Sequence, residues 1–122
     1  MIGYVTLGTN DLARGARFYD AIAAELGCRR VMDNEKFIAW GPADGGPGIG
    51  LTRPYNGERA TAGNGVMVAL AAADRPQVDR LHALALSLGG TDEGAPGERF
   101  TGFYAAYFRD LDGNKLNAFA MG

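Results

Sequence analysis

The stretch FYAAYFRDLDGNKLNAFA, Phe103 to Ala120, decides the fold of this chain. Alternating apolar runs flank the pair Asp112-Gly113. This is a strong hairpin signal, because glycine tolerates the positive φ that tight turns demand. We therefore predict two antiparallel strands joined by a two-residue turn at Asp112-Gly113, with residues 107–108 opposite residues 115–117. Asn117 then lies in mid-strand among apolar residues, which makes it a candidate functional side chain.

The rest of the chain alternates between strand and helix patterns. Period-2 runs of β-branched and aromatic residues predict strands, and apolar residues at helical spacing between an Asp and a Gly predict helices. The expected order is a strand over 2–7, a helix between Asp11 and Gly27, strands over 28–32, 36–40 and 49–53, a strand over 65–72, and a helix between Asp74 and Gly89 with Pro76 in its first turn. Residues 91–102 are expected to be mostly loop.

An internal repeat relates the two halves of the chain. A shift of 63 residues matches Tyr4 with Met67 and Tyr19 with His82. The order strand, helix, three strands thus occurs twice, which predicts two pseudo-symmetric βαβββ modules in an α+β fold. We place module 1 at about 1–54, a linker at about 55–64 and module 2 at about 65–122, within one domain of 122 residues.

A second shift aligns the later strands of the two modules. A shift of 67 residues lays Trp40 on Tyr107 and Gly50 on Asn117. We therefore expect Trp40 and Tyr107 to occupy the same kind of environment; parity alone leaves open whether that is the ligand side or the helix side.

Composition narrows the classes of function. Apolar residues make up 47% of the chain, the net charge is −2, and 19 glycines indicate many turns between short strands. The charge gives no basic footprint for nucleic acid, and no apolar run reaches the roughly 20 residues that span a bilayer. Cys28 is the only cysteine, so no internal disulfide forms. We expect a cytoplasmic protein without nucleic-acid or membrane partners.

Three motifs resemble the vicinal oxygen chelate superfamily of glyoxalases, bleomycin-resistance proteins and extradiol dioxygenases. They are YVTLGTNDLARGARFYDA from Tyr4, VALAAADRPQVDRLHALALSLGG from Val68 and FRDLDGNKLNAF from Phe108, and together they span most of the chain. The resemblance implies that the sheets of the two βαβββ modules form an open curved sheet around a ligand-holding cup.

The resemblance also locates the positions that hold a metal in many members of the family. They fall on Tyr4, Gly50, Met67 and Asn117, and the placement of Gly50 rests on the internal repeat alone. None of these side chains is a good ligand for Zn, Ni or Fe. His82 is the only histidine, so a two-histidine site cannot form, and on its helix we expect it to be packed. We expect no metal, no cofactor and no metal-dependent catalysis.

Without a metal, the expected site is an aromatic pocket with a few polar anchors. The alternative reading of the large side chains is simple core filling. The candidate ligand-binding residues are Tyr4, Trp40, Met67, Tyr107, Asn117, Arg53 and Arg109. Asn117 would orient a ligand carbonyl or hydroxyl, and the two arginines would meet a carboxylate.

Three classes of function follow. The first is a metal-free protein that binds a small organic molecule, as bleomycin-resistance proteins do. The second is an enzyme of the glyoxalase-like lyase or isomerase type (lactoylglutathione lyase-like), or one related to the dioxygenases, in which Tyr4 would be the acid or base. The third is an interaction module without a ligand. Because open sheet edges need covering, we also expect a homodimer; whether modules pair within or between chains stays open.

Overall fold

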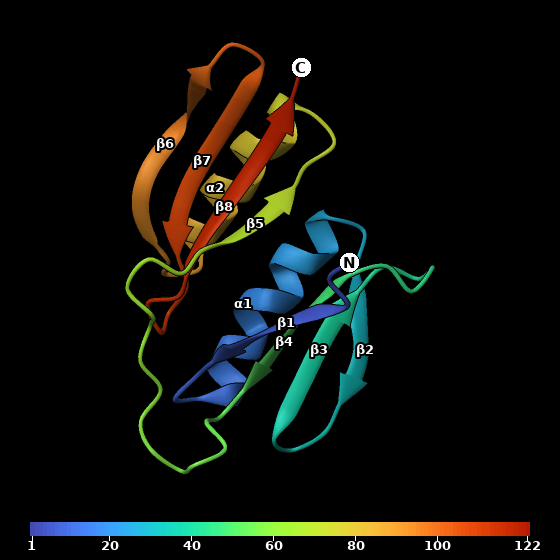
Figure 1. Cartoon of the computed structure of the whole chain (residues 1–122), viewed down its shortest axis with the longest axis vertical. Helices are drawn as coiled ribbons and strands as arrows, with labels where there is room; N and C mark the ends of the chain where they lie inside the picture. Colours follow the sequence, from blue (N-terminus) through green and yellow to red (C-terminus); the bar gives the residue numbers. More distant parts are fainter. The chain divides into compact units, whose positions relative to one another are not determined.

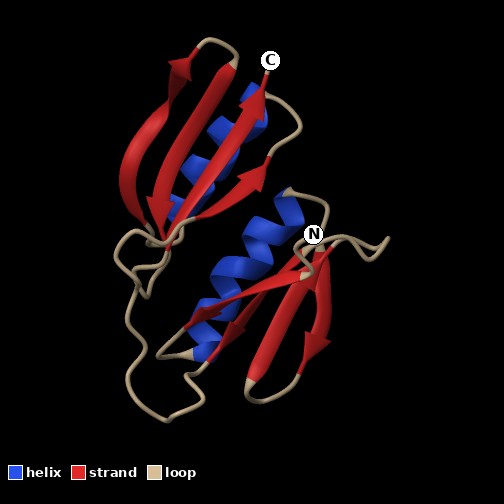
Figure 2. Cartoon of the chain, in the orientation of Figure 1, coloured by secondary structure: helices blue, strands red, loops and turns tan.

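The computed structural model describes all 122 residues as two compact units, 1–62 and 63–122. In each unit one helix covers one face of a four-stranded sheet (Figures 1 and 2). The α+β class and the two βαβββ modules are confirmed.

Unit 1 runs from the first strand to the fourth. Its elements are β1 (Tyr4–Gly8), α1 (Leu12–Glu25), β2 (Arg29–Asp33), β3 (Phe37–Gly41) and β4 (Gly48–Thr52). The sheet order is β1-β4-β3-β2, in which β1 and β4 are parallel and the other pairs antiparallel. The core between α1 and the sheet contains Phe18, Ile22, Ile38 and Leu51, all at most 5% exposed.

Unit 2 repeats this arrangement. Its elements are β5 (Val68–Ala71), α2 (Arg75–Ser87), β6 (Thr91–Phe100), β7 (Phe103–Arg109) and β8 (Lys115–Met121), with the sheet order β5-β8-β7-β6. Val78, Leu81, Phe108 and Leu116 are fully buried between α2 and the sheet. Neither helix, of 14 and 13 residues, is long and apolar enough to cross a membrane.

Both helices begin and end at the predicted signals. The Asp11 carboxylate accepts the amide of Arg14, and the Asp74 carboxylate accepts the amide of Gln77. Each bond satisfies one of the amides that a helix N-terminus leaves without a partner. After α1, Gly27 has a φ of +74°, the left-handed conformation that closes many helices.

The terminal hairpin has the predicted strands but a longer turn than predicted. Tyr107 lies opposite Asn117, and the last pair is Arg109 with Lys115, so five residues connect the strands instead of two. The reason is Asp110, which is 4% exposed. One of its carboxylate oxygens accepts the amides of residues 112 and 114, and the other accepts the side-chain amide of Asn114. Asp110 thus organises a loop wider than a simple Asp-Gly turn.

Two other expectations about unit 2 are wrong. Residues 91–102, expected to be mostly loop, contain the ten-residue strand β6. Glycines and a proline interrupt the alternation of apolar and polar residues that marks a strand. The strand accommodates them through shifts of pairing register between Asp92 and Gly94 and between Gly94 and Gly97. The strand expected over 65–72 is shorter, since β5 begins at Val68 and leaves Met67 outside it.

The segment expected to be a linker is partly bound to unit 1. The side chain of Asn10 donates to the carbonyl of Ala60 at 3.1 Å and accepts its amide at 2.7 Å. Ala60 is 7% exposed. The chain therefore stays attached to unit 1 almost up to the boundary at residue 62.

We predict that Asp110→Ala lowers the free energy of unfolding by about 3 kcal/mol, because three partly buried hydrogen bonds to a carboxylate lose their acceptor. Urea denaturation measures this change. Asp44→Ala is the matched control: its carboxylate is exposed and accepts only the Gly46 amide, so its cost is about 1 kcal/mol or less. Equal costs for the two variants would contradict the role of Asp110.

Candidate functional site

In each unit, one face of the sheet packs against the helix and the other does not; we call the second the open face. Side chains alternate between the two faces along every strand. In unit 1, Ile38, Trp40 and Leu51 face α1, so Tyr4 and Gly50 belong to the open face. In unit 2, Phe108 and Leu116 face α2, so Tyr107 and Asn117 belong to the open face.

The expectation that Trp40 and Tyr107 share an environment is wrong. The Trp40 ring lies 5.6 Å from that of Tyr19 on α1 and is 3% exposed, whereas Tyr107 lies on the open face. The cause is register. Gly50 pairs with Ala39, and its repeat partner Asn117 pairs with Tyr107, so Tyr107 corresponds to Ala39 and Trp40 to Phe108. A slip of one residue moves a side chain to the other face of a sheet.

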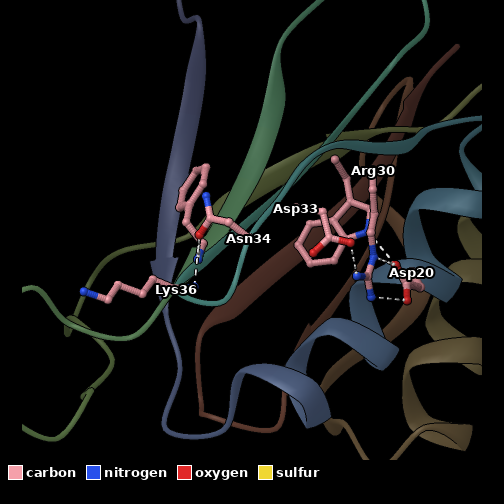
Figure 3. A network of polar contacts seen from close by, with 7 residues as sticks. Asp20, Arg30, Asp33, Asn34 and Lys36 are labelled. Atoms are coloured by element: carbon pink, nitrogen blue, oxygen red, sulfur yellow. Dashed lines mark hydrogen bonds and ion pairs between the residues drawn. The ribbon is translucent and has the colours of Figure 1, made fainter.

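Trp40 belongs to a polar network on the helix side of unit 1. Its indole N–H donates to Asp20 at 2.8 Å, and the Arg30 guanidinium lies 5.9 Å from the centre of its ring. Arg30 also binds the carboxylates of Asp20 and Asp33, each at 2.8 Å (Figure 3). The hydrogen bond from Arg30, followed by that from Trp40, holds the pKa of Asp20 below its ordinary value. Trp40 is therefore a packing residue and has no part in the open face.

On the open face of unit 1, aromatic rings occupy the candidate positions. Tyr4 is 66% exposed and meets Phe37 edge-on, with ring centres 6.5 Å apart. Gly50 has no side chain, and the Phe37 ring fills the space beside it: a Cβ atom at Gly50 would lie 2.5 Å from that ring. Any larger residue at position 50 would displace Phe37.

On the open face of unit 2, Asn117 is 2% exposed although it lies opposite the helix side. Its side-chain amide donates to the carbonyls of Ala106 and Ala118, at 3.1 and 3.2 Å. These bonds fix the plane of the amide beside Tyr107, its partner in register. The mid-strand position predicted for Asn117 is confirmed.

A row of aromatic side chains lies on this face, near the start of β7 and the end of β8. Phe100 stacks on Phe103 with ring centres 4.8 Å apart, and Phe103 stacks on Phe119 at 5.7 Å. Phe100 is 63% exposed. The face thus presents a continuous apolar surface next to the polar pair of Tyr107 and Asn117.

Two cations on this face were not among the candidates from the sequence. The Arg99 guanidinium lies 5.4 Å from the centre of the Tyr107 ring, and the Lys115 ammonium lies 5.5 Å from it. Arg99 falls in the segment expected to be mostly loop, so its face could not be assigned from alternation. The register also shifts between Glu98 and Phe100, so no local pattern in the sequence places Arg99 on this face.

The two arginines that were predicted to meet a carboxylate already have partners in the chain. Arg109 donates to Glu93 at 2.7 Å and to the carbonyl of Gly113 at 2.8 Å. Arg53 donates to the carbonyl of Glu35 at 3.3 Å. Arg53 lines an open hollow of about 690 Å³ near the start of α1, away from the open face.

The single histidine is packed, as predicted. His82 on α2 is 8% exposed, and its Nε2 lies 2.9 Å from Asp92. This hydrogen bond, followed by that from the amide of Gly94, lowers the pKa of Asp92. His82 therefore ties α2 to β6 on the helix side of the sheet.

The family comparison agrees with this geometry. Residues 1–118 match the model of the glyoxalase/bleomycin resistance protein/dioxygenase superfamily. The chain belongs to this superfamily. No curated protein sequence matches the chain.

Several solved structures have the same fold as this chain. A glyoxalase/bleomycin resistance protein from Albidiferax ferrireducens T118 is 38% identical, with a TM-score of 0.90 over 98% of this chain and 97% of that one. A hypothetical protein from S. aureus is 25% identical, with a TM-score of 0.74 over 96% and 91% of the two chains. A family enzyme from Burkholderia phytofirmans PsJN, 19% identical, shares the fold with a TM-score of 0.78 over 98% of each chain.

The residues at the positions that the resemblance assigns to metal ligands carry side chains that divalent cations bind poorly. Gly50 offers no donor atom and Met67 only a thioether, while the Asn117 amide nitrogen is held by two backbone carbonyls. Hard or borderline divalent cations prefer imidazole and carboxylate. No group of three or more His, Cys, Asp or Glu side chains gathers anywhere in the chain.

We predict that Asp20→Asn destabilises the protein by on the order of 1 kcal/mol at neutral pH, since a half-exposed ion pair and its hydrogen bonds weaken. Because folding lowers the pKa of Asp20, its stabilisation is present above the ordinary carboxyl pKa and is lost as the pH falls through the lowered value. Urea denaturation across this acidic range should therefore show the curves of wild type and variant converging.

The control for this prediction is Asp33→Asn, because Asp33 is 56% exposed at its side chain and bonds Arg30 alone. It should cost less than Asp20→Asn. A difference between wild type and Asp20→Asn that persisted unchanged into acid would contradict the assigned ion pair.

Proposed function

We propose that this superfamily member binds a small organic molecule on the open face of unit 2, without a metal. The observation that carries the proposal is the buried Asn117 amide beside Tyr107 on a face that packs against no helix. The carbonyls of Ala106 and Ala118 accept the N–H donors of this amide, which offsets the cost of burying it and fixes its orientation. The side-chain carbonyl oxygen of Asn117 supplies a directional contact for a ligand N–H or O–H.

The surroundings of Asn117 suit a small-molecule site. Such sites are mostly apolar and aromatic, with a few polar groups that fix the orientation of the ligand. Here Phe103 and Phe119 form the apolar part, and Tyr107 and Asn117 supply the polar groups. The hollow beside Arg53 is a weaker candidate, because Arg30 in its lining already binds two carboxylates.

The chemistry of the donor set supports binding without a metal. A glycine, a thioether and an amide held by the backbone replace the imidazole and carboxylate ligands that a divalent cation prefers. Phe37, packed against Gly50, fills the space in which a ligand side chain would project from that position.

Catalysis by Tyr4 has less support from the geometry. Its side chain is 66% exposed and contacts Phe37, and no carboxylate or imidazole lies within hydrogen-bond distance to accept its proton. A general acid or base needs a partner positioned within hydrogen-bond reach. The proposal of a lyase or isomerase activity is therefore less well supported than that of ligand binding.

We further propose a homodimer. Each sheet ends in edge strands, β1 and β2 in one and β5 and β6 in the other, and edge strands carry backbone groups that another chain can pair with. Val31 and Met32 on β2 are 57% and 52% exposed. Light scattering should give twice the chain mass of 12.9 kDa, and a monomeric mass at micromolar concentration would refute the dimer.

A titration of the full chain with small aromatic fragments, followed by ¹H–¹⁵N NMR in the presence of a chelator, tests the binding proposal. We expect bound fragments to shift the amides of β7 and β8, and Tyr107→Leu to weaken their binding about tenfold through loss of the ring contact. Tyr55→Leu is the matched control, because Tyr55 is fully exposed in unit 1 and should leave affinity unchanged. The absence of any fragment response on β7 and β8 would overturn the proposal.

A further inference from the structure

Two Asn-Gly pairs lie in the segment that connects β4 to β5 (Figure 1). They are Asn56-Gly57 and Asn64-Gly65, and no other asparagine of the chain precedes a glycine. Asparagine is a thermolabile residue, because the backbone amide nitrogen of the next residue can attack its side-chain carbonyl. Glycine in the next position carries no side chain to hinder this attack. The two pairs are therefore the chemically weakest asparagines in the sequence.

The structure engages both reacting groups of the first pair in hydrogen bonds. The Gly57 amide, whose nitrogen would make the attack, donates to the carbonyl of Pro54 at 3.0 Å. The side-chain carbonyl oxygen of Asn56 accepts the amide of Glu58 at 2.9 Å. Cyclisation at this pair therefore requires a local opening in which both bonds are lost.

The second pair lies in a turn that leaves both reacting groups without a hydrogen bond. The turn spans Gly63 to Val66, and the Val66 amide donates to the Gly63 carbonyl at 3.2 Å. Gly65 is the third residue of the turn and has a φ of +96°, a conformation that glycine adopts without strain. Neither the Gly65 amide nor the Asn64 side chain takes part in a hydrogen bond. Attack at this pair requires no bond of either group to open.

Exposure does not distinguish the two pairs. All four residues are exposed to solvent. A Cβ atom added at either glycine would meet no other atom within 4 Å. Water and solvent base therefore reach both pairs, and the hydrogen bonds of the reacting groups are the difference between them.

From this contrast we infer that Asn64 is a site of spontaneous deamidation in the folded protein and that Asn56 is protected. The Gly65 amide gives its proton to solvent base, and its nitrogen forms a bond to Cγ of Asn64. The bond from Cγ to the side-chain nitrogen breaks, and that nitrogen takes up a proton and leaves as ammonia. Water then adds to either carbonyl of the resulting succinimide and breaks its C–N bond, which gives aspartate or isoaspartate. Nothing is oxidised or reduced.

The modification changes the chain just before β5 and leaves the two cores intact. It adds one negative charge to a chain whose net charge is −2. Isoaspartate also routes the backbone through the former side chain, which lengthens it by one carbon and disrupts the turn from Gly63 to Val66. Residues 61–67 are all exposed, and none of them belongs to the core of either unit. The modified protein should therefore remain folded.

The test is incubation of the full chain in mildly alkaline buffer, followed by trypsin digestion and mass spectrometry. Trypsin yields the peptides 37–59 and 60–80, since the arginines inside them precede prolines. Each peptide contains a single asparagine, Asn56 in the first and Asn64 in the second. Peptide 60–80 should gain the mass that replacement of NH₂ by OH brings and should separate into aspartate and isoaspartate forms. Peptide 37–59 should change at least about tenfold more slowly, because two hydrogen bonds must open first.

The chain unfolded in urea is the matched control, because it keeps the sequence and loses both turns. The two peptides should then deamidate at similar rates. In the folded chain, Asn64→Gln should abolish the change in peptide 60–80, since glutamine cyclises far more slowly, and should leave the rate of peptide 37–59 unaltered. Equal rates in the folded chain, or a faster change at Asn56, would overturn the inference. A preference for Asn64 that persisted unchanged in urea would also overturn it, because the preference would then come from the local sequence and not from the hydrogen bonds.

Discussion

The pairing register of each sheet decides which side chains remain for function. In both units one helix buries one face of four strands, and each strand then presents every second residue on the other face. The β7–β8 register puts Asn117 and Tyr107 together on that face. In unit 1 the equivalent pair is Gly50 and Ala39, so the two halves share a fold but not a surface.

The two units differ in the face of the sheet on which their large aromatic residue lies. In unit 1 the large aromatic Trp40 turns inward, where Asp20 and Arg30 satisfy its indole and cover its ring. In unit 2 the aromatic residue at the open-face position is Tyr107, and its polar neighbours are cations instead of carboxylates. We propose unit 2 as the ligand side because Asn117 and Tyr107 lie together on its open face.

The fold could be predicted because its signals are local. The caps at Asp11 and Asp74, the glycines after each helix and the alternation around the terminal turn each act within a few residues. The five-residue turn escaped prediction because the buried Asp110 carboxylate, and not the Asp-Gly pair, determines its width. The strand β6 escaped because bulges at its glycines break the period of two.

The candidate site could be predicted only in part. Asn117 could be predicted because it is a polar residue in an apolar strand. The predicted hairpin then placed Tyr107 near it, on the opposite strand. Trp40 was misplaced because the repeat is offset by one residue between β3–β4 and β7–β8, and a repeat shift does not reveal such an offset. Arg99 was missed because its position depends on an irregular strand and on room left by two glycines.

The central claim is that this superfamily member holds its ligand with side chains alone. Elemental analysis of the purified, tag-free protein tests it most directly, followed by thermal unfolding with Zn²⁺, Ni²⁺, Mn²⁺ and Fe²⁺. The account predicts no stoichiometric metal and no shift in the unfolding temperature. One equivalent of bound metal, with a stabilisation of about 2.7 kcal/mol at a hundredfold excess over Kd, would contradict it.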